Sequence, residues 1–179
     1  MEVITYFTEE KIQNLFCMIL GSLSVILALL FLSIIKYSFY KGMAIPLLLF
    51  GVLQATLGTV AFKRSTNDLE RVQVMMEQQP ERIETEELYR MQTVLQHFQV
   101  YQWIEIVLIA AGLVLYLKFY KSPSTFWKGL GLGLVLQASV TLGLDTIGHR
   151  RAERYVHQLM PTFASALYIS KRPCDHDKS

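Results

Sequence analysis

Four ionisable side chains recur at intervals of four residues just after the last apolar stretch of the chain. They are Asp145, His149, Glu153 and His157. Residues spaced four apart lie on one face of an α-helix, so these groups form a single, slowly drifting row. Carboxylate and imidazole groups are ligands that zinc, iron and manganese use in proteins. The row is therefore a candidate metal site, with Asp145 and His149 as candidate catalytic residues.

His97 and Glu105 would approach this row from an antiparallel helix, in a bundle such as di-iron carboxylate proteins use. The Glu-x-x-His pairs of that class are absent, and Arg150, Arg151 and Arg154 crowd the same segment with positive charge. We therefore expect a solvated helix with salt bridges between residues four apart. No cofactor is expected, and a metal ion or haem stays open as the alternative.

Glu105 is a candidate for chemistry inside a membrane. It lies 13 residues before Lys118, the basic residue that ends an apolar stretch. At 1.5 Å per residue this separation is about 20 Å. Glu105 is then about 10 Å inside the opposite edge of a hydrocarbon core of about 30 Å. An acid at such a depth is a functional candidate by default, so Glu105 joins the candidate catalytic residues.

Two glutamines occupy matching positions in apolar stretches, Gln54 in "FGVLQATL" and Gln137 in "GLVLQASV". They are 83 positions apart. An unpaired amide in lipid costs several kcal/mol, so each side chain needs a partner. We expect the two amides to form a hydrogen bond to each other at the centre of the bundle. The alternative is that both line a path for a substrate or an ion.

The elements that position these groups are four apolar stretches. The chain has 179 residues, of which 52% are hydrophobic and 18% charged. Uncharged or nearly uncharged runs cover residues 15–35, 42–62, 106–117 and 129–144. About 20 apolar residues span a hydrocarbon core as a helix. The first two runs meet this length, and the other two meet it if Glu105 and Asp145 lie near or just inside one boundary. The runs therefore predict four transmembrane helices and contact with the lipid bilayer. A net charge of +2 gives no reason to expect a nucleic acid partner.

The expected helices cover about 8–36, 42–78, 85–118 and 123–160, with Thr8 and Thr85 as N-caps and Pro161 as the last helix stop. The last three extend beyond the bilayer on one side, where they form a helical stalk from residues 63–98 and 145–160. Apolar residues at helical spacing mark the packed faces of this stalk: Leu69, Val72, Met76, Leu88, Met91, Leu95 and Phe98. A charge network is expected on the stalk from Glu70, Arg71, Arg150, Arg151, Glu153 and Arg154.

The chain reads as two copies of one helical hairpin. The pairs Glu70-Arg71 and Glu153-Arg154 are 83 positions apart, as the two glutamines are. "FYKG" at 39–42 matches "FWKG" at 126–129 at an offset of 87, which differs by about one helical turn. We expect one all-α domain over residues 1–160, with repeat one at 8–78 and repeat two at 85–160. Parallel repeats are related by a pseudo-two-fold axis along the membrane normal. Residues 161–179 are expected to form a short amphipathic segment and a disordered tail.

Without a strong catalytic constellation, we expect a small polytopic membrane protein that acts as a binding or assembly component rather than an enzyme. It would form a homo-oligomer or dock another protein, as a pore or a sensor. One alternative is a membrane-embedded metal- or cofactor-dependent enzyme or redox protein that uses the acids and histidines of the third and fourth helices. A further alternative is a small dimeric transporter in which Gln54, Gln137 and Glu105 line the path.

The lysines and arginines near the spans favour one orientation. The stalk side carries eight of them, at 11, 63, 64, 71, 90, 150, 151 and 154, and the hairpin side five, at 36, 41, 118, 121 and 128. Positive residues are enriched in the cytoplasm, which favours a cytoplasmic (inner) membrane with the stalk and both termini in the cytoplasm. The hairpin connections are purely basic, whereas residues 65–90 are acidic, and this contrast favours the opposite orientation.

Overall fold

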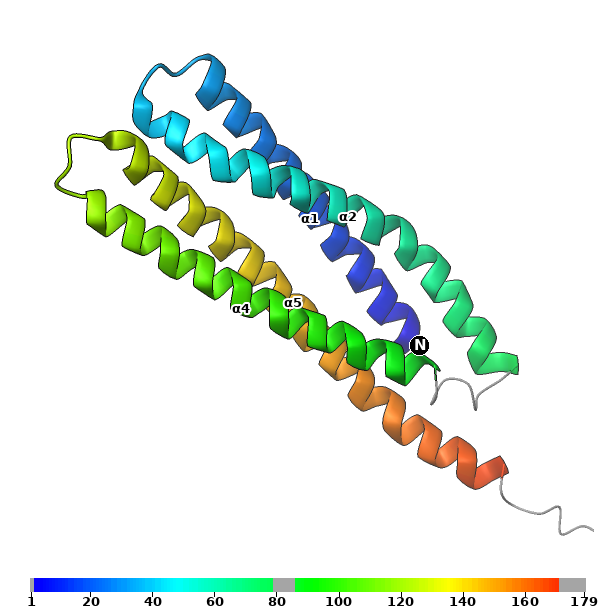
Figure 1. The fold of residues 1–179 in the computed structure, drawn as a ribbon. Helices are drawn as coiled ribbons and strands as arrows, with labels where there is room; N and C mark the ends of the chain where they lie inside the picture. Colours follow the sequence, from blue (N-terminus) through cyan, green and yellow to red (C-terminus); the bar gives the residue numbers. More distant parts are fainter. Residues whose placement is uncertain (1, 79–85, 171–179) are drawn as a thin grey trace, which may run out of the picture.

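The described part of the chain consists of four long α-helices in two hairpins. The computed structural model describes residues 2–78 and 86–170, which form α1 (Glu2–Ser33), α2 (Ser38–Gln78), α4 (Leu88–Phe119) and α5 (Thr125–Ser170). α1 packs along α2, and α4 packs along α5 (Figure 1). The short connections of the two hairpins lie at the same end of the molecule. The prediction of an all-α chain with two helical hairpins is confirmed.

All four helices are long and apolar enough to cross a membrane. The candidate spans fall within Thr5–Ser33, Ser38–Val74, Leu88–Phe119 and Thr125–His157. Large hydrophobic side chains are exposed along these helices, as expected for surfaces that contact lipid rather than water. The chain is therefore an integral membrane protein with four candidate transmembrane helices.

The two hairpins meet mainly along α2 and α5, with a smaller contact between α1 and α5. Glycines bring these two backbones together near the hairpin connections. A Cβ atom on Gly42 would collide with the carbonyl oxygen of Phe126, and one on Gly129 would collide with the carbonyl oxygen of Phe39. Small residues permit such close approach of transmembrane helices. α2 and α5 are therefore the inner helices, and α1 and α4 are the outer ones.

The opposite end of the molecule contains an apolar core to which all four helices contribute. Its buried members are Tyr6, Phe7, Val72, Met91, Ala152, Tyr155 and Val156, and Leu69, Leu88, Leu95 and Phe98 pack against them. Six of the seven apolar residues that were expected to mark the packed faces belong to this cluster, and the side chain of Met76 lies outside the described part of the chain. The end of the molecule that holds this core is called the stalk below.

The start of the first helix differs from the prediction. α1 begins at Glu2, so Thr8 lies inside the helix rather than at its N-cap. No glycine or proline interrupts the preceding residues, and the buried rings of Tyr6 and Phe7 anchor this turn in the apolar core. The stalk consequently contains four helices instead of three. At its other end α1 stops at Ser33, three residues before the expected Lys36.

The remaining helix ends differ by smaller amounts, with one exception. α2 begins at Ser38 rather than 42, where the amide of Lys41 reaches the carbonyl oxygen of Tyr37 over 3.4 Å. α4 begins at Leu88 and ends at Phe119, and the expected cap Thr85 lies outside the described residues. α5 begins at Thr125, so Pro123 lies just before it.

The exception is Pro161, which was expected to end the last helix. α5 continues through it to Ser170. A proline inside a helix removes one backbone hydrogen bond and crowds the preceding turn, but its φ of about −65° is helical. The following segment, "TFASALYIS", contains no glycine or second proline to stop the helix. The tail expected beyond it, residues 171–179, lies outside the described part of the chain.

Candidate functional site

A pair of buried amides joins the two hairpins inside the membrane. Gln137 Nε2 donates a hydrogen bond to Gln54 Oε1 over 2.8 Å. Gln137 Oε1 in turn accepts a hydrogen bond from the Ser24 hydroxyl on α1 over 3.1 Å. The side chains of Gln54 and Gln137 are only 5% and 3% exposed. Hydrogen bonds of this kind contribute about 0.6–2 kcal/mol each in a membrane, so the three residues fix the register of three helices.

Glu105 faces α5 from the outer helix α4. It is only 8% exposed, and its Oε2 atom has no hydrogen-bond partner among the described residues. The polar groups that interact with its carboxyl come from α5, where Thr141 lies within hydrogen-bonding reach and Asp145 acts through its charge. Thr141 and Asp145 are one turn apart. An acid of α4 thus lies against a hydroxyl and a second acid of α5.

Polar residues of α1 cover the same part of α5. Gln13 Nε2 donates a hydrogen bond to the carbonyl oxygen of Leu144 over 2.7 Å. Cys17 interacts with the side chain of Gln54 and lies within the electrostatic reach of Glu105 and Asp145. Gln13 Oε1, Asn14 Nδ2 and Gln54 Nε2 are buried polar atoms of α1 and α2 that lack a hydrogen-bond partner among the described residues.

These contacts and buried polar atoms define a set of side chains that is called the polar row. Its members are Gln13, Asn14, Cys17, Ser24, Gln54, Glu105, Gln137, Thr141 and Asp145. On α5 the row extends from Gln137 to Asp145, which is about 12 Å along the helix axis. It links the centre of the membrane to its stalk side, and all four helices contribute to it.

The candidate metal ligands do not converge. His97 and His157 are exposed, and the ring of His97 lies 6.2 Å from that of Tyr101. His149 lies beside Phe98, with its Nε2 atom 3.8 Å from Glu153 Oε1. Within residues 2–78 and 86–170, no group of three or more His, Cys, Asp or Glu side chains is placed to hold a metal ion. The arrangement therefore leaves Asp145 with the polar row rather than with the histidines.

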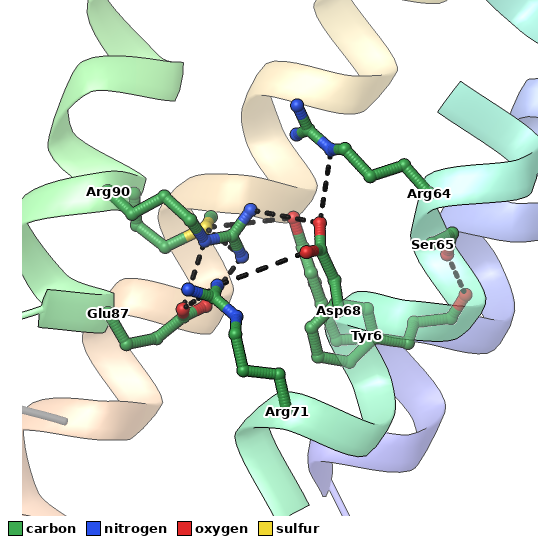
Figure 2. A network of polar contacts seen from close by, with 9 residues as sticks. Tyr6, Arg64, Ser65, Asp68, Arg71, Glu87 and Arg90 are labelled. Atoms are coloured by element: carbon green, nitrogen blue, oxygen red, sulfur yellow. Dashed lines mark hydrogen bonds and ion pairs between the residues drawn. The ribbon is translucent and has the colours of Figure 1, made fainter. Parts of the chain in front are cut away.

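A charged cluster lies beside the apolar core of the stalk (Figure 2). Its members are Arg64, Asp68, Arg71, Glu87 and Arg90. Glu87 is fully buried and accepts hydrogen bonds from both Arg71 Nη2 at 3.0 Å and Arg90 Nη2 at 2.6 Å. Arg90 also reaches Asp68 Oδ2 at 3.4 Å, and Arg64 Nε binds the same oxygen at 3.2 Å. This charged cluster connects the end of α2 to the start of α4.

The stalk charges expected from the sequence fall into three groups. Arg71 belongs to the charged cluster, whereas Glu70, Arg150, Glu153 and Arg154 are exposed. Arg151 is buried, and its guanidinium group lies 5.6 Å above the Tyr6 ring. The Tyr6 ring also stacks on that of Tyr155 at 4.1 Å, so Arg151 serves the apolar core through a cation–π contact.

Sequence reasoning missed the most buried acid of the stalk. The spacing of Glu87 and Arg90 by three residues was an available signal for their ion pair. The contact of Glu87 with Arg71 had no such signal, because it joins two helices across residues 79–85. Tyr6 and Phe7 were missed because they precede Thr8, which resembles a helix N-cap.

Comparison with known proteins identifies no family for this chain. No protein-family model, curated protein or solved structure matches the chain.

Proposed function

We propose that this protein is an assembly component of its membrane, and that two copies of the chain pair along the outer face of α4. The single observation that carries the proposal is the pattern of exposed residues on that face. An apolar row with the spacing of a heptad runs along α4, and small residues lie at its centre. The partner for the binding role expected from the sequence is then a second copy of the same chain.

The row on α4 follows alternating steps of three and four residues. It consists of Val100, Trp103, Val107, Ala110, Val114 and Leu117. Apart from Ala110, which is also exposed, every member is more than half exposed. Valine occupies each first position of this heptad, and a β-branched residue there is typical of parallel two-stranded coiled coils. The fourth positions hold Trp103, Ala110 and Leu117. Two chains inserted in the same direction would bring such rows together in parallel.

The centre of this row permits close approach. Ala110 and Ala111 are both exposed and lie between Val107 and Val114. Small residues at matching depth let two transmembrane backbones pack closely, which is the main source of helix association in lipid. The outward face of α1 differs, because Ile26, Leu29 and Leu30 place large exposed side chains at the corresponding depth. α4 is therefore the outer helix favoured for pairing.

We also infer that each chain is built from two copies of one hairpin, related by a pseudo-two-fold axis along the membrane normal. Reciprocal contacts support this inference. Gly42 approaches Phe126 while Gly129 approaches Phe39, so equivalent residues exchange equivalent contacts across α2 and α5. The Gln54–Gln137 hydrogen bond also joins equivalent positions. Such isologous contacts are the signature of two-fold symmetry.

Cysteine cross-linking in native membranes tests the pairing. In a chain whose own Cys17 and Cys174 are replaced by alanine, Val114→Cys is expected to form a disulfide-linked dimer on mild oxidation. Leu113→Cys is the matched control, since Leu113 is exposed at the same depth but lies about 100° around the helix from Val114, on the flank of the row. Equal cross-linking at both positions, or a monomer at both, would contradict the proposal.

We propose a cytoplasmic (inner) membrane as its location, with the stalk and both termini in the cytoplasm. The excess of lysine and arginine near the stalk side supports this orientation. A reporter that fluoresces only in the cytoplasm should be active when it is fused to the C-terminus. It should be silent when it is inserted in the connection around Tyr37, and the reverse pattern would invert the assignment.

A further inference from the structure

The polar row is confined to one half of the membrane. Beyond the level of Ser24, Gln54 and Gln137, the four helices contain no polar side chain for two turns or more. The apolar segments are residues 25–32, 43–53, 106–115 and 130–136. In this half the inner helices touch through glycine, and a Cβ atom on Gly133 would lie 2.8 Å from both the Met43 carbonyl oxygen and the Pro46 ring. Polar groups thus approach the centre of the membrane from the stalk side alone.

Glu105 is the charged member that lies deepest in this row from the stalk side. A buried polar atom without a partner is costly in lipid, and an unpaired carboxylate is costlier still. Glu105 Oε2 is buried and has no hydrogen-bond partner among the described residues, and Asp145 places a second acid beside it. The Glu105 carboxylate therefore needs a small cation that neutralises its charge.

Both donors and acceptors are left over among the members of the polar row. Gln54 Nε2 and Asn14 Nδ2 are buried donors, and Gln13 Oε1 and Glu105 Oε2 are buried acceptors, with no partner in the described part of the chain. Such a mixture suits water, which gives and accepts hydrogen bonds in turn. It suits a metal cation poorly, because amide N–H groups repel positive charge. Two carboxyls and one hydroxyl also fall short of the ligand sets that hold hard cations.

We propose that Glu105 is a proton-binding site inside the membrane, which exchanges its proton with the stalk side only. Thr141 and Asp145 of α5 are its polar partners, and Cys17 is the titratable group of α1 within its electrostatic reach. The member of the polar row on α2 is the uncharged Gln54. The site is independent of the pairing of chains proposed above, because Glu105 faces α5 and not the outer row of α4.

Chemical labelling of the full-length protein in lipid vesicles tests the site. A hydrophobic carbodiimide adds to a carboxyl group that carries its proton, and mass spectrometry locates the adduct. We expect Glu105 to be labelled, with the yield falling about tenfold per pH unit once the acid is mostly ionised. Glu105→Gln should lose the label, whereas Glu70→Gln, at an exposed stalk acid, should keep it.

Two outcomes of this experiment would overturn the proposal. One is a folded protein, judged by an unchanged thermal transition, whose Glu105 is not labelled at any pH. The other is protection of Glu105 by sodium ions at constant pH, which would identify a metal cation as the ligand. Labelling that is insensitive to sodium supports the proton.

Cys17 serves as a reporter of the side from which the row is reached. In a Cys174→Ser chain, a membrane-impermeant thiol reagent should modify Cys17 from one face of the vesicle only. Two further chains identify that face. Tyr89→Cys marks the stalk and Tyr37→Cys marks the hairpin connection, and both tyrosines are strongly exposed. Cys17 should react from the Tyr89 side. Reaction of Cys17 from the Tyr37 side, or from neither side, would contradict access from the stalk side.

Discussion

At the scale of single residues, the amide pair at the membrane centre has unequal members. Gln137 binds both Gln54 and Ser24, whereas Gln54 binds Gln137 and lies against Cys17. Gln137→Leu should therefore destabilise the protein by about 1–3 kcal/mol, and Gln54→Leu by less, because the remaining amide of Gln137 keeps its bond to Ser24. Unfolding in mixed detergent micelles measures both losses.

The double variant provides the control for this pair. Replacing both glutamines removes the partner and the unpaired group together, so its loss should be smaller than the sum of the two single losses. Additive losses would mean that the two amides do not interact. This pair was predictable from the sequence, because identical spacing in two apolar helices leaves each amide few partners except the other.

Glu87 is the residue on which the charged cluster depends. Glu87→Gln would leave Arg71 and Arg90 without their shared carboxylate. We expect the free energy of unfolding to fall by about 2 kcal/mol. This is less than the roughly 3–5 kcal/mol lost when a fully buried ion pair is broken, because the Arg71 side chain stays 38% exposed. The measurement is the free energy of unfolding of the stalk, followed by hydrogen exchange of its amides.

Arg64→Ala is the matched control for this prediction. Arg64 binds Asp68 in the same charged cluster, but its side chain is 62% exposed, so its removal should cost about 0–1 kcal/mol. A larger loss for Arg64→Ala than for Glu87→Gln would show that burial does not set the strength of this cluster. The contact of Glu87 with Arg71 was beyond sequence reasoning, since no helical spacing connects residues on either side of 79–85.

At the scale of the elements, glycines decide how closely α2 and α5 approach. Gly129→Ala places a methyl group against the carbonyl oxygen of Phe39, so the two helices must separate. We expect the free energy of unfolding to fall by about 1–3 kcal/mol. Gly143→Ala is the control on the same helix, because nothing lies within 4 Å of its added Cβ atom. Alanine there should be neutral or stabilise by up to about 1 kcal/mol.

The same unfolding measurement decides this prediction. Equal effects at Gly129 and Gly143 would mean that helix propensity, and not the contact between hairpins, governs both positions.

The existence of the helices could be predicted, but their ends could not. Long apolar runs require helices in lipid, because every backbone polar group must be satisfied within the segment. The ends depend on contacts made elsewhere. The first turn of α1 exists because Tyr6 and Phe7 reach the apolar core of the stalk, and α5 passes Pro161 because no second breaker follows. A cap or a proline read alone therefore placed both ends wrongly.

At the scale of the whole molecule, contacts between the hairpins lie at three levels. Glycine contacts lie near the connections, the Gln54–Gln137 bond lies at the centre, and the apolar core and charged cluster lie in the stalk. Sequence patterns pointed to the centre and to part of the apolar core. They could not place the charged cluster, because it depends on how the second hairpin sits against the first.

Separate expression of the two hairpins tests whether these contacts suffice for assembly. Fragments of residues 1–78 and 86–179 each contain two candidate spans and can insert independently. We expect them to associate in the membrane and to co-purify in mild detergent, because all three levels of contact join one fragment to the other. Gly129→Leu in the second fragment should abolish co-purification, since the larger side chain separates α2 from α5 at the level where their backbones touch. Gly143→Leu, on the same helix but facing open space, should leave it intact. Fragments that fold and never associate would mean that the covalent connection alone keeps the hairpins together.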